Sequence, residues 1–170
     1  MIKVWDLWVR IGHWFLVFCI TAAWLTRHGG GAFHDWFGYC ALGIVAARIA
    51  WGFFGSTHAR FNDFVKSPAA IVEYAQALPR HHEQHYVGHN PLGGYMVLAL
   101  LLSVALTSIS GWLYTTDRFW GVAWVGESHE VLADALLILV ALHIGGVVFA
   151  CYRERENLIA AMFHGRKRMR

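Results

Sequence analysis

Residues 129–151 read HEVLADALLILVALHIGGVVFAC. This stretch is apolar on nearly every face and, at about 1.5 Å per helical residue, is long enough to cross the roughly 30 Å hydrocarbon core of a bilayer. His129 and His143 are 14 residues apart, and two heptads of a left-handed bundle return to the same helix face. We therefore expect a transmembrane helix that directs two imidazoles into a bundle, about 21 Å apart along its axis.

Three further segments have the same apolar character. The four predicted spans are 8–26, 34–54, 92–114 and 129–151, separated by a polar loop at 55–91. The composition agrees, because 57% of the residues are hydrophobic and only 15% are charged, whereas soluble domains are about a quarter charged. We predict an all-α fold, an integral membrane four-helix bundle that forms one domain over residues 1–170, with a short surface helix at 68–78 in the loop. This composition excludes a disordered or nucleic-acid-binding chain.

The distribution of basic residues predicts the orientation. With the N-terminus inside, the inner segments hold 11 Lys and Arg residues, and the outer loops hold only Arg27 and Arg118. This positive-inside bias predicts that both termini and the 55–91 loop are cytoplasmic. We expect the first apolar run to remain as an uncleaved anchor and the basic residues of 166–170 to lie against anionic lipid.

The cysteines limit the redox chemistry. Cys19, Cys40 and Cys151 all fall within apolar runs, and no CxxC or CxxCH motif is present. A disulfide framework, a thiolate metal site and covalent haem of the c type are therefore not expected.

Four of the 11 histidines lie in or at the edge of the spans, and they pair by depth. His13 and His143 each lie about 5–6 Å to the cytoplasmic side of the midpoint of their spans. His34 and His129 each lie about 15 Å to the outer side. Two imidazoles facing each other across an apolar gap suit the two axial positions of a b haem, and two such haems would form an electron route across the membrane.

The same histidines also allow roles that do not involve haem. A single histidine in a span is often a hydrogen-bonded structural residue, and zinc could take two nitrogens, with Glu130 and Asp134 as further ligands at the outer site. Four histidines matched in depth and face favour haem.

Arg48 lies level with the inner pair, where it could pair with a haem propionate or extend to the lipid headgroups.

Each span also carries a characteristic motif. The first has VWD at 4–6 and RIGHW at 10–14, the second has HDWFGY at 34–39 and RIAWGF at 48–53, the third follows GHNPLG at 88–93, and the fourth has HEVLA at 129–133 and LH at 142–143. Along its whole length the chain resembles the bacterial cytochrome b561 and nickel–iron hydrogenase b-type cytochrome superfamily. One departure is Asp134, where the family commonly has Asn; a carboxyl at this depth is expected to be neutral or paired, and it bears on the outer haem.

The resemblance implies an integral cytochrome of the bacterial cytoplasmic (inner) membrane with two b haems. His13 and His143 would ligate the inner haem iron, and His34 and His129 the outer one. Such proteins transfer electrons between the membrane quinone pool and a partner. Arg48 and His89, the latter in the GHNP motif, are candidate contacts for a propionate or a quinone. No catalytic residue is assigned, and the chain is expected to be an electron-transfer subunit or a quinone-linked oxidoreductase.

The partners are open at this point. The short outer loops 27–33 and 115–128 would present the outer haem to a periplasmic c-type cytochrome or dehydrogenase subunit. One alternative is a stand-alone superoxide:quinone oxidoreductase, in which Arg27, His28 and Arg118 attract the anion. An alternative of another class is a transition-metal-binding membrane protein, because His81, His85 and His89 recur every four residues beside His82. Membrane lipid is a partner in every case, and a homo-oligomer is allowed for.

Overall fold

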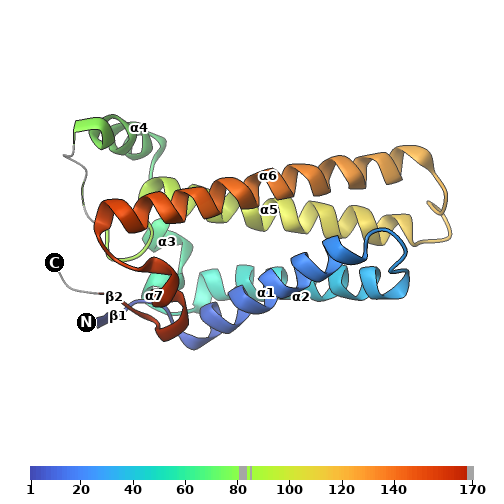
Figure 1. Cartoon of the computed structure of the whole chain (residues 1–170), viewed down its shortest axis with the longest axis horizontal. Coiled ribbons are helices and arrows are strands. Elements are labelled where there is room, and N and C mark those ends of the chain that lie inside the picture. The colour runs from blue at the N-terminus through green and yellow to red at the C-terminus, as the bar shows by residue number, and fades with distance from the viewer. Residues whose placement is uncertain (81–83, 85, 168–170) are drawn as a thin grey trace. The chain divides into compact units, whose positions relative to one another are not determined.

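The computed structural model describes residues 1–80, 84 and 86–167 (Figure 1). Four long helices dominate this part of the chain: α1 (Leu7–Thr26), α2 (Ala32–Phe54), α5 (Pro91–Tyr114) and α6 (Ala123–Glu154). Each is long and apolar enough to cross a membrane. The prediction of an all-α fold with four spans is confirmed. The fourth helix is longer than predicted, since it begins at Ala123 and ends at Glu154.

The remaining elements are short. They are β1 (Ile2–Lys3), η1 (Thr57–Ala59), α3 (Phe61–Phe64), α4 (Pro68–Ala77), η2 (Leu78–Arg80), α7 (Leu158–His164) and β2 (Arg166–Lys167). The predicted surface helix is α4, and it begins where expected. The Ser67 side chain accepts a hydrogen bond from the backbone N–H of Ala70, and Pro68 occupies the first turn, where its missing N–H costs nothing.

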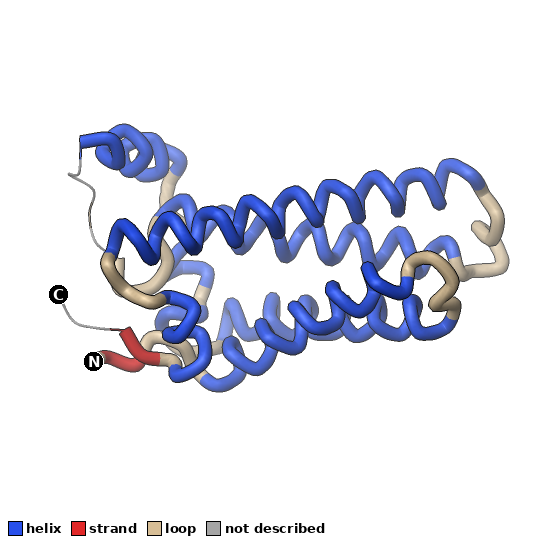
Figure 2. Tube along the Cα trace, viewed as in Figure 1, coloured by secondary structure: helices blue, strands red, loops and turns tan. Residues whose placement is uncertain are grey.

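The described chain divides into two compact units, each of which is treated by itself. The bundle unit comprises Ile11–Ile49 and Leu100–Ala141, and the terminal unit comprises Met1–Arg10, Ala50–Ala99 and Leu142–Arg170. All four long helices run through both units, and loops join these helices at their ends (Figure 2).

Within the bundle unit, polar contacts join helices that are distant in sequence. The Tyr39 hydroxyl on α2 lies 3.0 Å from the Thr115 hydroxyl that follows α5. On α1, a Cβ added at Gly12 would lie 3.9 Å from the Ile44 side chain of α2, which is ordinary contact. Cys19 and Val45 are fully buried in this unit.

The terminal unit joins the two ends of the chain. β1 and β2 pair antiparallel, with Ile2 opposite Lys167. α7 ends at Gly165, whose φ of +78° suits glycine, and the Gly165 carbonyl accepts the backbone N–H groups of Val4 at 2.9 Å and Trp5 at 3.1 Å. A small core in this unit consists of Val4, Trp5, Val9, Ala59 and Ala161, and Ile2 of β1 packs against it.

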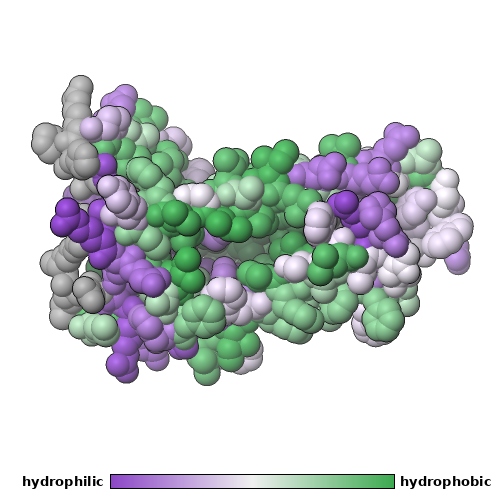
Figure 3. Space-filling view, in the orientation of Figure 1, coloured by the Kyte–Doolittle hydropathy of each residue, from purple (hydrophilic) through white to green (hydrophobic). Residues whose placement is uncertain are grey.

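The surface of the long helices is apolar. Large hydrophobic side chains are exposed along them, among them Trp8, Leu102 and Ile138. Figure 3 shows hydrophobic residues over the long helices and hydrophilic residues towards both ends. A soluble monomer rarely exposes so large an apolar area, whereas helices in contact with lipid do.

Candidate functional site

His34 and His129 form the centre of the candidate site in the bundle unit. His34 lies on the first turn of α2, and His129 lies on the second turn of α6. Their ring centres are 6.0 Å apart, and the ring planes are nearly perpendicular at 87°. Both side chains are half-buried. The structure therefore brings together the two histidines that the sequence predicts as the outer pair.

A backbone carbonyl holds Nδ1 of each ring. Nδ1 of His34 lies 2.9 Å from the Ala23 carbonyl oxygen of α1, and Nδ1 of His129 lies 3.0 Å from the Thr107 carbonyl oxygen of α5. A carbonyl can only accept a hydrogen bond, so Nδ1 carries the proton and Nε2 keeps its lone pair. Metal-ligating histidines are typically oriented in this way.

α5 supplies a second layer behind His129. The Ser110 hydroxyl donates to the Thr107 carbonyl at 2.8 Å and lies 3.2 Å from Nδ1 of His129, so that it can accept from the ring. Gly111 leaves room for this ring, because an added Cβ would lie 2.9 Å from Cε1 of His129. These residues were not predicted from the sequence. The sequence pattern that could have identified them is the group of polar and small residues at 107, 110 and 111, which stands out in an otherwise apolar helix.

The geometry of the pair fits a metal ion between the rings. Bonds from a metal to imidazole nitrogens are about 2 Å long, so two imidazoles on opposite sides of one ion have ring centres on the order of 6 Å apart. Among the described residues, no group of three or more His, Cys, Asp or Glu side chains could hold a metal ion. A metal ion held between these two rings would take its remaining ligands from elsewhere, as haem iron does from the porphyrin. Zinc with Glu130 and Asp134 receives no support.

Carboxylates follow both histidines in sequence. Asp35 and Glu130 lie close enough to interact electrostatically with His129. Asp134 is exposed and, within the described part of the chain, makes no hydrogen bond or salt bridge. At 3.6 residues per turn it lies about 140° around α6 from His129. The described contacts therefore show no partner for Asp134, and the expectation of a neutral or paired carboxyl remains a prediction.

The inner histidines belong to different units. His13 lies in the bundle unit, where its ring makes an edge-to-face contact with Trp14 at 5.1 Å, and His143 lies in the terminal unit. Both are half-buried. Their pairing remains a prediction. Arg48, in the bundle unit, is also half-buried, and one of its guanidinium nitrogens is fully enclosed.

His89 is held between aromatic rings in the terminal unit. Its ring centre lies 4.7 Å from that of Trp5 and 5.0 Å from that of Phe64. The next residue, Asn90, caps α5, because its side-chain oxygen accepts the backbone N–H of Gly93 at 2.7 Å. The GHNP motif thus begins the third long helix, and it carries His89, whose ring lies between Trp5 and Phe64.

Residues 4–165 match the family model for prokaryotic cytochrome b561. The chain belongs to this family. No curated protein and no solved structure matches it. Membership confirms the resemblance found in the sequence, and it implies haem b binding and transmembrane electron transfer in a multi-pass bacterial membrane protein.

Asp6 anchors the start of the first long helix of the cytochrome. Its carboxylate accepts hydrogen bonds from the indole N–H of Trp51 at 2.9 Å, the hydroxyl of Ser56 at 2.5 Å and the backbone N–H of Val9 at 2.9 Å. Burial alone would raise the pKa of Asp6, but these hydrogen bonds outweigh it and lower the pKa below its ordinary value of 3.8. The VWD motif therefore ties the beginning of α1 to the end of α2.

The basic residues of the two predicted outer loops have local contacts in the cytochrome. The Arg27 side chain donates to Nε2 of His28 at 2.9 Å and lies over Trp24, and Arg118 lies over Phe119. Three exposed acidic residues lie within or beside the 115–128 loop, at positions 117, 127 and 130. These features do not favour attraction of an anion, and the superoxide alternative remains a prediction.

Most of the histidine-rich loop of the cytochrome lies outside the described residues. This applies to His81, His82 and His85, whereas His89 is the one member of that pattern within them. The transition-metal alternative therefore remains a prediction.

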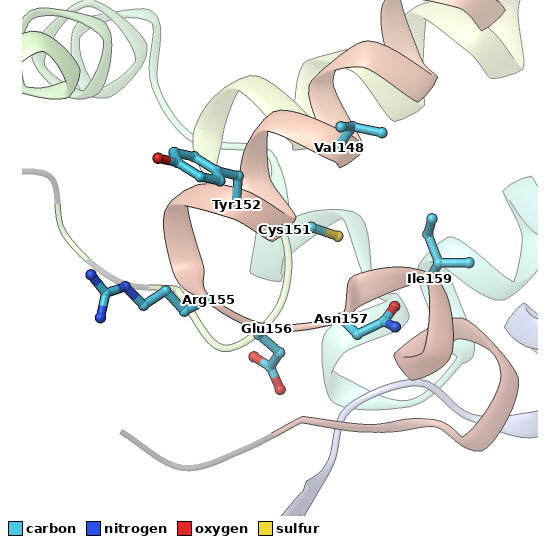
Figure 4. A pocket seen from close by; sticks show the side chains of 7 residues that line it. All are labelled: Val148, Cys151, Tyr152, Arg155, Glu156, Asn157 and Ile159. Carbon is cyan, nitrogen blue, oxygen red and sulfur yellow. The ribbon is translucent and has the colours of Figure 1, made fainter.

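A pocket of about 490 Å³ opens where α6 turns into α7 (Figure 4). It is lined by Val148, Cys151, Tyr152, Arg155, Glu156, Asn157 and Ile159. The turn begins at Arg155, which has a positive φ of 48°, and the Cys151 sulfur accepts the backbone N–H of Leu158 at 3.3 Å. None of the candidate haem ligands lines this pocket.

Proposed function

We propose that this cytochrome moves electrons across the bacterial inner membrane through two b haems with bis-histidine ligation. His34 and His129 would bind the outer haem, and His13 and His143 the inner haem. The arrangement of the outer pair carries the proposal, because the ring centres are 6.0 Å apart and both Nδ1 atoms lie on backbone carbonyls. Two helices thereby present two Nε2 lone pairs to one ion, and the haem iron would supply the redox change.

The electrons would pass between the quinone pool and a periplasmic redox partner, either a c-type cytochrome or a dehydrogenase subunit. Arg48 and His89 would contact a propionate or the quinone, since both are partly enclosed side chains that can donate hydrogen bonds. Both termini would be cytoplasmic, as the excess of basic residues in the segments that flank them indicates. The chain would then act as one domain, which its four helices running through both units support.

Haem stoichiometry tests the proposal directly. The purified detergent-solubilised protein should contain about two haems b per chain by pyridine haemochrome assay and protein quantitation. Replacing His34 or His129 by Ala should remove the outer haem, and replacing His13 or His143 should remove the inner one. His28→Ala is the matched control, because His28 is an exposed histidine near the outer pair in sequence. One haem in the wild type would contradict one of the pairings, and none would contradict the whole proposal.

Quinol chemistry tests the proposed electron route. In membranes that contain the cytochrome, a reduced quinol should reduce the haems, and the change should appear in the α-band of the visible spectrum. If the quinone binds in the terminal unit, where His89 lies, His34→Ala should leave quinol reduction of the inner haem intact. A fully loaded protein that no quinol reduces would contradict the quinone link and leave the haem ligation standing.

A further inference from the structure

Lys167, in β2, has a buried side chain near a basic end of the chain. Its side chain is 7% exposed, whereas Lys3 and Arg166, which pair in the same two-stranded sheet, are both exposed. The sequence alone predicts that Lys167 belongs to a tail that lies against anionic lipid. A lysine bound to lipid headgroups would be exposed, so this position needs a different explanation.

The Lys167 ammonium has defined contacts. Nζ donates to the Gly88 carbonyl at 3.2 Å and lies 5.8 Å from the centre of the Trp5 ring. Burial lowers the pKa of Lys167, although Glu154 and Glu156 lie within electrostatic range and oppose this shift. Burying a lysine is unfavourable unless its charge is paired or hydrogen-bonded. Here the ammonium donates a hydrogen bond to one loop carbonyl, that of Gly88.

That carbonyl belongs to the residue before His89. The Gly88–His89 turn is also restricted from another side, since a Cβ added at Gly88 would lie 3.3 Å from Oδ2 of Asp63. The same oxygen lies 3.0 Å from Nδ1 of His58. Lys167 and the His58–Asp63 pair therefore both border the turn that presents the His89 ring to Trp5 and Phe64.

We propose that Lys167 is a positioning residue, which holds the Gly88 carbonyl and thereby fixes the His89 imidazole between Trp5 and Phe64. The strand β2 thereby supports the GHNP segment, a role that the sequence alone did not indicate. The geometric part of this inference stands by itself. Its functional part, that the fixed imidazole contacts a propionate or quinone, rests on the proposed function.

Amine labelling of the wild-type holoprotein tests the burial. The chain has only three lysines, Lys3, Lys66 and Lys167, so peptide mass spectrometry can follow each one during brief reductive methylation. Lys167 should react roughly tenfold more slowly than the exposed Lys3, since its amine becomes accessible only on local opening. Equal rates would overturn the proposal, and this test needs no variant to fold.

The reactivity of His89 tests the positioning. In Lys167→Met, which keeps an unbranched side chain and removes the donor, carbethoxylation of His89 by diethylpyrocarbonate should accelerate roughly five- to tenfold, the factor expected from one lost hydrogen bond. Exposed His28 serves as the internal standard. Lys3→Met should leave the rate unchanged, and Lys167→Arg, which can still donate to a carbonyl, should restore most of the protection. Unchanged His89 reactivity in a folded Lys167→Met protein would overturn the proposal.

Kinetics separate this inference from the proposed function. If His89 contacts quinone, Lys167→Met should raise KM for a quinol analogue several-fold with a smaller effect on kcat, and Lys167→Arg should reverse the change. Faster labelling of His89 with unaltered quinol kinetics and haem potentials would support the positioning and contradict only the role assigned to His89.

Discussion

Gly111 packs directly against His129, so that a Cβ added at Gly111 would lie 2.9 Å from Cε1 of the imidazole. The His129 ring is not free to move away from Gly111, because its Nδ1 lies 3.0 Å from the Thr107 carbonyl oxygen on the same helix as Gly111. α5 thus determines the orientation of the His129 ring, which α6 carries and which we propose as a haem ligand. Second-layer contacts of this kind typically change metal affinity or activity by 10–100-fold when they are lost.

Gly111→Ala should therefore displace the His129 ring and lower the haem content from about two towards one per chain. Gly43→Ala is the matched control. Gly43 is also a helical glycine, has open space around an added Cβ and lies about 180° around α2 from His34. The measurement is pyridine haemochrome content per chain. Equal haem content in the two variants would contradict the role of Gly111.

Ser110→Ala should raise the midpoint potential of the outer haem. The Ser110 hydroxyl can accept from Nδ1–H of His129, which makes the ligand more electron-donating and stabilises the oxidised iron. Losing this bond should shift the potential upward by roughly 20–40 mV, equivalent to about 0.5–1 kcal/mol for one electron. Ser108→Ala, a buried serine two residues away, should leave the potential unchanged in the same redox titration. A shift of equal size in both variants would show that the effect is not specific to the hydrogen bond.

Two acidic residues on α6 should affect the outer haem differently. Glu130 interacts electrostatically with His129, so Glu130→Gln should raise the outer midpoint potential by on the order of 20 mV, the effect of an exposed charge worth about 0.5 kcal/mol. Asp134 lies about 140° around the helix from His129, so Asp134→Asn should cause no measurable shift. Redox titration of both variants checks this. A larger shift from Asp134→Asn would show that its carboxyl acts on the haem.

Asp6 should make the terminal unit sensitive to acid. Because hydrogen bonds lower its pKa below 3.8 in the folded protein, the carboxylate contributes stability above pH 3.8, and this contribution is lost as the pH falls through the lowered value. Asp6→Ala should cost about 2 kcal/mol at neutral pH, since it removes a helix cap and two side-chain hydrogen bonds. Asp6→Asn should cost less and should flatten the acid dependence of thermal unfolding. An unaltered acid dependence in Asp6→Asn would assign it to another group.

The positions of the long helices followed from the sequence because apolar length is a local property. The ends of α6 did not, since hydropathy marks only the apolar part of a helix, whereas helical backbone hydrogen bonding continues through Gly126, Glu127 and Ser128 beyond that part. The pairing of His34 with His129 was predicted from helical rise, and their ring centres lie 6.0 Å apart, whereas their depth in a membrane remains a prediction.

Residue types and spacing by themselves determined the four spans and the family, because a bilayer selects long apolar segments, and they predicted the histidine set. Only the tertiary structure decided which backbone groups orient those side chains. The carbonyls of Ala23 and Thr107 have no sequence signature, since every residue carries a carbonyl. The burial of Lys167 was equally hidden, because it depends on Trp5 and Gly88, which are 162 and 79 positions away along the chain.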